Sequence, residues 1–315
     1  MDRELKRAIL KTLAYFDTFD FPLTVEEVYH WLWTYEKPVS LVVVRDGLMD
    51  LVSDGKIEQK NSFFCFIGRA SIIRMRQSAI PLIEEKMRIA KKAARILRCI
   101  PFLDAVYVCN TVAGSIPHEQ SDIDVFIIIQ PGRLWLTRAM TTVLLSIFRY
   151  RRTQTSVHNK ICLSFYVTHD HLNLEDIQSG SPDIYLAYWI DQLIPVYDPT
   201  GVMAHILKKN TWGKKWVPHA YTEERMYPFW EVKDASFSRM VRLGLEKIIG
   251  FVGVSVLEEK ARYIQKKKMD GNIHSLQDLP DSRVVVSDTM LKFHENDRRN
   301  YFRQRWIDRC FELHI

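Results

Sequence analysis

Polar and apolar positions in the first part of the chain recur with spacings that predict three helices and a hairpin. Residues 4–16, "ELKRAILKTLAYF", place apolar side chains three and four positions apart, as an amphipathic helix does. Thr24 and Glu27 form a capping box ahead of a second helix. Ser40 can cap a third helix, which is expected to end at Gly55. Two short strands joined by a polar turn follow.

The order of these elements in residues 1–75 resembles a winged helix-turn-helix domain. That resemblance implies a third helix that enters the DNA major groove and a hairpin that contacts the phosphate backbone. The third helix has more acidic than basic residues, which does not favour phosphate contact. The charged residues of this helix are Arg45, Asp46, Asp50 and Asp54. We therefore expect a protein-docking or substrate-presenting module, with DNA binding as the less favoured alternative.

The rest of the chain predicts an α+β fold with a central mixed sheet. Residues 76–100 have the pattern of a helical connector with a basic outer face. A core domain at 101–178 contains strands and one helix, and residues 179–315 predict a mostly helical C-terminal region with a long helix at 235–268. The predicted core elements are strands at 104–109, 122–129 and 160–168 and a helix at 133–148.

The candidate chemistry lies in "SDIDVFIII", residues 121–129. Successive side chains of a strand point to opposite faces, so Asp122 and Asp124 project together, about 6.6 Å apart along the chain. Two carboxylates that converge to about 4 Å repel each other by roughly 4 kcal/mol at an effective dielectric constant of about 20. A shared cation relieves this repulsion, and hard oxygen ligands suit Mg²⁺. A polar sheet edge facing solvent is the alternative for an isolated pair.

In its context the aspartate pair resembles the motif of nucleotidyltransferases of the polymerase-beta superfamily, in particular the minimal and antibiotic-modifying branch. Their pattern is a strand, Gly-Ser, a short variable loop, and a Ser-Asp-x-Asp strand. Aligned backwards from Asp122, Asn110 and Thr111 stand at the Gly-Ser positions. Ser115 stands at the second glycine, and Ser121 is the serine of the second motif.

The resemblance implies a magnesium-dependent enzyme that moves a nucleoside monophosphate from an NTP to a hydroxyl acceptor. Asp122 and Asp124 would bind two Mg²⁺ ions, and Thr111 and neighbouring loop groups would bind phosphates. Arg133 and Arg138 follow the carboxylate strand and are further phosphate candidates, because guanidinium groups pair well with phosphate oxygens. Helix surface charge explains these two arginines equally well. The acceptor stays open between a small molecule, a protein and an RNA.

Two departures from the family pattern predict an alternative function. Asn110 replaces a glycine, although asparagine tolerates left-handed backbone better than most residues. The third carboxylate of active members has no counterpart in the strand at 160–168, where Ser164 is the central polar residue and Asp170 lies just beyond the end. The alternative is a catalytically degenerate protein that binds a nucleotide, DNA or a protein partner as a regulator.

Composition narrows the class of protein without identifying it. The net charge of +6 arises from 44 basic and 38 acidic residues spread along 315 positions, which mildly favours an anionic ligand. The five cysteines include no closely spaced pair, which indicates reduced thiols and a cytoplasmic protein. The N-terminal sequence lacks a signal-peptide pattern, and charges interrupt every apolar run, so no membrane association is expected.

Overall fold

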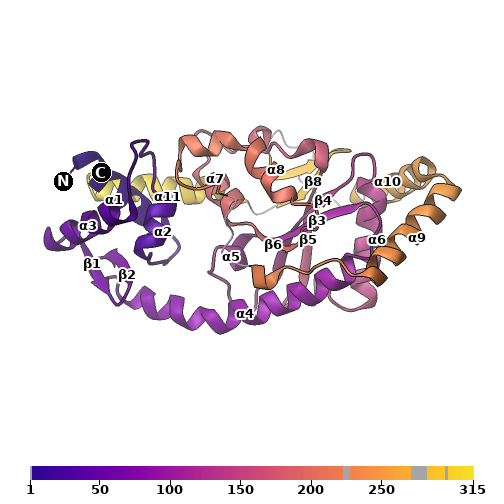
Figure 1. The fold of residues 1–315 in the computed structure, drawn as a ribbon, viewed down its shortest axis with the longest axis horizontal. Helices are drawn as coiled ribbons and strands as arrows, with labels where there is room; N and C mark the ends of the chain where they lie inside the picture. The colour runs from indigo at the N-terminus through magenta and orange to yellow at the C-terminus, as the bar shows by residue number, and fades with distance from the viewer. Residues whose placement is uncertain (1, 223–227, 271–281, 295–296) are drawn as a thin grey trace.

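The computed structural model describes residues 2–222, 228–270, 282–294 and 297–315. Its architecture is α+β, as predicted, with a mixed sheet flanked by helices (Figure 1). A long helix, α4 (Ser71–Leu97), runs along one edge of the molecule and connects the N-terminal module to the sheet. The C-terminal helix, α11 (Arg299–Glu312), returns to the N-terminal module, so the two ends of the chain lie on the same side.

The N-terminal module contains the three helices and the hairpin that the sequence predicts. Thr24 and Glu27 form the capping box: Thr24 Oγ1 accepts from Glu27 N at 3.4 Å and Glu27 Oε2 accepts from Thr24 N at 2.9 Å. The third helix ends before Gly55, which has the expected positive φ of 64°. Leu23 also bridges to Phe64 of the hairpin. The elements are α1 (Arg3–Asp17), α2 (Val25–His30), α3 (Leu41–Ser53), β1 (Ile57–Lys60) and β2 (Phe63–Phe66).

The charges of α3 are balanced within the module. Asp50 and Asp54 lie 3.4 and 2.8 Å from Lys6 Nζ of α1, and Arg45 pairs with Asp46 at 3.2 Å. Lys6 and Arg45 are thus engaged by carboxylates of α3.

A six-stranded sheet is formed by the described residues, in the order β6-β3-β4-β5-β8-β7. β4 and β5 are parallel, and every other neighbouring pair is antiparallel. Half of these strands come from residues after 178, where the sequence predicts mostly helices. The strands are β3 (Leu103–Val108), β4 (Ile123–Ile129), β5 (Ile161–Thr168), β6 (Ile194–Tyr197), β7 (Val284–Val286) and β8 (Met290–Phe293).

Helices cover the two faces of the sheet differently. Phe126 and Ile128 of β4 belong to an apolar cluster that includes α7, whereas Ile127 belongs to a second cluster with α4 and α6. The predicted helix at 235–268 is two helices, because Gly253 adopts a φ of 102° between them. The remaining elements are α5 (Asn110–Ala113), α6 (Leu134–Ile147), α7 (Ile184–Gln192), α8 (Val202–Lys209), α9 (Ser236–Val252), α10 (Val254–Asp270), η1 (His169–His171), η2 (Glu175–Ile177), η3 (Thr211–Lys215) and η4 (Pro228–Trp230).

The N-terminal module shares an apolar core with α7 and α11. Tyr15 stacks on Tyr188 of α7 with ring centroids 4.4 Å apart. Trp306 of α11 meets Trp33 edge to face at 5.1 Å, and its Nε1 donates to Lys11 O at 3.0 Å. The module is therefore packed against the rest of the chain as well as joined to it by α4.

Arg299 fixes the start of α11 in the interior. It is buried and forms ion pairs with Asp183 and Asp297, both at 2.8 Å. Its Nη1 also donates to Ile177 O at 2.8 Å, while the second oxygen of Asp183 caps α7 by accepting from Leu186 N. A buried charge is stable only when it is paired, so these contacts lock α11 to α7.

Replacement of Arg299 by methionine should destabilise the protein strongly. The buried carboxylate of Asp183 would lose its cationic partner, and we expect the free energy of unfolding to fall by about 3–5 kcal/mol. The neighbouring, exposed Arg298 lies over the rings of Tyr301 and Phe302 and forms no ion pair with the described residues, so Arg298→Met should cost no more than about 1 kcal/mol. Urea denaturation followed by tryptophan fluorescence measures both variants. Equal stability of the two variants would contradict the structural role of Arg299.

Candidate functional site

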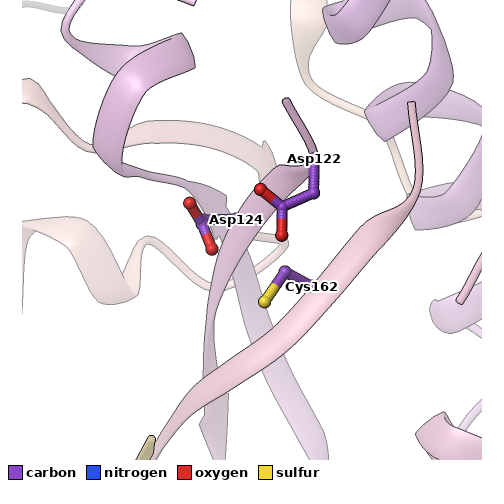
Figure 2. Close-up of side chains that lie close together, drawn as sticks. All are labelled: Asp122, Asp124 and Cys162. Atoms are coloured by element: carbon purple, nitrogen blue, oxygen red, sulfur yellow. The ribbon is translucent and has the colours of Figure 1, made fainter. Parts of the chain in front are cut away.

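The predicted aspartate pair converges at the start of β4. Asp124 lies opposite Cys162 in the parallel pairing of β4 with β5. One oxygen of Asp122, one oxygen of Asp124 and the sulfur of Cys162 all lie within 4.8 Å of one another. Figure 2 shows the three side chains turned toward one another across the two strands. The period-two geometry of the strand therefore places both carboxylates on one face, as the sequence predicts.

The electrostatics of the pair favour a cation. Burial, followed by the negative charge of Asp122, raises the pKa of Asp124 from 3.8 to about 6. Arg152 Nε lies 3.1 Å from Asp122 Oδ2 and supplies one positive charge. Burial also raises the pKa of Cys162 to about 12, so this group stays a neutral thiol near pH 7. The two carboxylates thus fit a hard ion such as Mg²⁺, and the thiol does not contribute a charged ligand.

The carboxylates open onto a cavity of about 600 Å³. Residues of α5, β4, β5 and α7 line it, together with residues of β8 and of the start of α11. The lining residues include Asn110, Thr111, Asp122, Asp124, Arg152, Phe165, Tyr185, Trp189, Lys292, His294, Asp297, Arg298 and Phe302. Negative and positive groups therefore face the same space.

The C-terminal segment brings two cations to this cavity. Lys292 is buried and bonded to Asp297 at 3.1 Å, and burial lowers its pKa to about 8. The guanidinium of Arg298 lies over Tyr301 and Phe302, at 4.7 and 5.1 Å from their ring centroids. In the part of the chain that the structure describes, Arg298 forms no ion pair, so its charge is available to a ligand.

Sequence reasoning missed Lys292 and His294, although a signal for them was present. In "MLKFH", residues 290–294, apolar and polar positions alternate from Leu291 onward, as in a strand with one polar face. His294 Nε2 lies 3.1 Å from Ser164 Oγ, and burial lowers the pKa of this ring to about 3. The central polar residue of β5 is therefore paired with a neutral imidazole from beyond β8.

Two of the predicted phosphate-binding residues lie beside the aspartates. Asn110 has a φ of 55°, the left-handed conformation that asparagine tolerates, and its Oδ1 accepts from Trp189 Nε1 at 2.8 Å. Thr111 lines the cavity next to it. Ser115 and Ser121 do not line this cavity, and Ser121 Oγ instead donates to His118 O at 2.9 Å. The structure thus joins Asn110 and Thr111, but not the two serines, to the aspartate pair.

The structure places Arg133 and Arg138 away from the aspartates. Both belong to the α6 region, which follows the far end of β4 and packs on the other face of the sheet. Arg133 lies over Phe102, and the nearly buried Arg138 lies over Phe293 and donates to Gln265. Neither arginine lines the cavity of the aspartates, whereas Lys292 and Arg298 do.

Asp170 is likewise far from the site, because β5 extends to Thr168 as predicted. It lies at the end of the strand opposite to Cys162, about 20 Å away along the chain. The third carboxylate on the cavity wall is Asp297. Burial opposes the ionisation of Asp297, but the hydrogen bonds and charge of Arg299, with the charge of Lys292, lower its pKa to about 2. Such a carboxylate is a weak proton acceptor.

A second cavity of about 430 Å³ adjoins the first. The two share Asn110, Thr111, Tyr185, Arg298 and Phe302 on their walls. The second cavity is bounded by aromatic residues of α1 and the following loop, and it includes Ser115. The aspartate pair is therefore reached from a cleft that continues toward the N-terminal module.

Comparison of the chain with models of protein families, with curated proteins and with solved structures gave no match in any of the three. Among the described residues, no helix has both the length and the apolar character needed to cross a membrane. A functional assignment therefore depends on the geometry of the site itself.

The raised pKa of Asp124 predicts a pH-dependent effect of Asp124→Asn in a metal-free buffer containing EDTA. The folded protein binds this proton more tightly than the unfolded chain does, so stability is lost as the pH rises from about 4 through about 6. Asparagine removes the titration, and we expect the variant to be more stable than the native protein by about 3 kcal/mol at pH 8.

Below pH 4 the gain in stability should be close to zero. Urea unfolding at both pH values measures it, with Asp170→Asn as the control, because Asp170 is an exposed aspartate at the far end of β5. A gain of equal size at the two pH values would show that the effect does not come from the carboxyl proton.

Proposed function

We propose that this chain is a magnesium-dependent nucleotidyltransferase that moves a nucleoside monophosphate from an NTP to a hydroxyl acceptor. The observation that carries the proposal is the convergence of Asp122 and Asp124 at a cavity that also contains Thr111 and two cations from the C-terminal segment. The resemblance of the surrounding sequence to polymerase-beta-type enzymes supports the same reaction. The central sheet would then be of the nucleotidyltransferase type.

Different residues of the cavity would bind different parts of a triphosphate. Asp122 and Asp124 would hold Mg²⁺, which when bound supplies the positive charge that offsets the phosphate oxygens. Thr111 would donate its hydroxyl to a phosphate. Arg298 offers planar donors that no carboxylate of the described residues pairs with, and Lys292, with a pKa of about 8, is mostly protonated at pH 7.

The second cavity gives the acceptor a route to the α-phosphate. It shares part of its wall with the first and extends toward the N-terminal module, so an acceptor there would approach between α1 and α11. The order of three helices and a hairpin, with the bridge from Leu23 to Phe64, supports a winged-helix fold for this module. The paired charges of α3 favour a role in presenting the acceptor over a role in binding DNA.

A specific observation favours a second candidate function. Asp297 is bound to Arg299 and Lys292, and its lowered pKa leaves the cavity without a strong carboxylate base among the described residues other than the proposed metal-binding pair. A protein that binds Mg²⁺ and a nucleotide without transfer would keep the pair and lose the base. Release of pyrophosphate from bound NTP in the presence of acceptor mixtures distinguishes this regulator from the enzyme.

Nucleotide binding should require the aspartate pair and the metal together. We expect calorimetric titration of the native chain with each NTP to show binding with Mg²⁺ and little or none without it. Asp122→Asn with Asp124→Asn should abolish the metal-dependent part, because the amides keep the shape and lose the charge. The absence of binding to every NTP by a folded native protein would exclude the proposal.

Arg298 and Arg133 allow a direct test of which arginine meets the phosphates. Arg298→Ala should weaken NTP binding about tenfold or more, because a charge-assisted hydrogen bond is lost. Arg133→Ala should leave the affinity unchanged, since that side chain lies over Phe102 on the other side of the sheet. Titrations at one fixed salt concentration compare the two variants. The reverse ranking would restore the assignment based on sequence alone.

A further inference from the structure

Helix α9 is turned so that its polar side, rather than its apolar side, meets the body of the protein. Ser238, Arg242 and Glu246 recur at every fourth position and form its anchoring row. Arg242 donates to Tyr197 Oη at 2.6 Å and pairs with Asp234 at 2.6 Å. Ser238 is fully buried, and Glu246 accepts from the backbone of Phe102. The helix is therefore held in place by specific polar contacts.

The apolar side of α9 faces solvent as a continuous row. Phe237, Met240, Ile248 and Phe251 follow the spacing of one helix face and are 68%, 63%, 62% and 95% exposed. Among the described residues, no apolar side chain of α9 is fully buried. An amphipathic helix normally buries its apolar side against another apolar surface. Within the described parts of the chain, this row has no such surface packed against it.

The row is symmetric about Gly244. Met240 and Ile248 lie four residues before and after this glycine, and Phe237 and Phe251 lie seven residues before and after it. A Cβ added at Gly244 would meet no atom within 4 Å, so no contact within the chain requires glycine there. Glycine is unfavourable inside a helix, but it allows another backbone to approach closely. Read in either direction along the helix, the row therefore shows the same order of residue types: aromatic, aliphatic, glycine, aliphatic, aromatic.

Neighbouring residues of α6 extend the apolar surface. Val143 and Ile147 of α6 are exposed, and an apolar hollow of about 400 Å³ lies between α6 and α9, lined in part by Met140, Val143 and Leu245. The exposed parts of these side chains and of the α9 row amount to roughly 700 Å². A stable interface needs about 800 Å² from each partner, so the surface is of the right size.

We propose that this surface joins two copies of the chain, with α9 of one copy crossing α9 of the other in antiparallel orientation at Gly244. A twofold axis requires a surface that is complementary to itself, and the symmetric row meets that condition. Phe237 of each copy then lies beside Phe251 of the partner, about 10 Å from the crossing point. The helix lies at the end of the molecule away from the N-terminal module, so both clefts stay open (Figure 1).

The mass of the particle in solution tests the proposal. Light scattering of the native chain should give twice the chain mass of 37.1 kDa at micromolar concentration. Met240→Lys with Ile248→Lys places unpaired charges in the contact, and the dissociation constant should rise about 100-fold or more. Ile67→Lys is the matched control, an equally exposed apolar residue of the N-terminal module, and it should remain dimeric.

Gly244→Cys gives a second measurement that does not depend on weakening the contact. The twofold crossing brings the two introduced thiols together, so mild oxidation should yield a covalent dimer in high proportion. Arg239→Cys, on the other side of the same helix, should not crosslink. A native chain that is monomeric in solution overturns the proposal. This holds even if the monomer binds lipid vesicles through the apolar row of α9. A dimer that survives the double lysine variant and leaves Gly244→Cys uncrosslinked overturns it as well.

Discussion

The buried ion pairs of Arg299 determine where the last part of the chain lies, and the candidate site depends on that position. Asp183 caps α7 with one carboxylate oxygen and binds Arg299 with the other, so a single side chain aligns α7 and α11. α7 carries Tyr185 and Trp189 on the cavity wall, and the segment leading into α11 carries Lys292 and Arg298. Two elements that are remote in sequence are thereby fixed relative to each other by one guanidinium group.

The site depends both on local sequence patterns and on contacts between segments far apart in the chain. Only the local patterns can be recognised in the sequence. The capping box at Thr24, the left-handed Asn110 and the shared face of Asp122 and Asp124 follow from local geometry, and each is observed. The sequence predicts Arg133 and Arg138 as phosphate candidates because they follow the aspartate strand. The helix after a strand begins at the C-terminal end of that strand, whereas Asp122 and Asp124 lie at its N-terminal end, so the two arginines lie away from the pair although they follow it closely in sequence.

The positive groups of the cavity could not be assigned from the sequence for a related reason. Lys292 and Arg298 reach the site because β8 pairs with β5, which is more than a hundred residues earlier. The alternation in "MLKFH" predicts a strand with a polar face, but nothing local states which strand it joins. The glycine at position 253 is a similar case: the continuous helical pattern on either side conceals the break that its backbone conformation produces.

The pairing of β8 with β5 has a consequence for how the protein is made. During synthesis on the ribosome, β4 and β5 can pair as soon as they emerge, but β5, whose residues are mostly apolar, then presents an open edge. That edge is closed only when Met290–Phe293 has left the exit tunnel, more than a hundred residues later. Exposed apolar edges attract other chains, so the nascent protein passes through an aggregation-prone interval. A chaperone that covers β5 during that interval would raise the yield of folded protein without altering the finished structure.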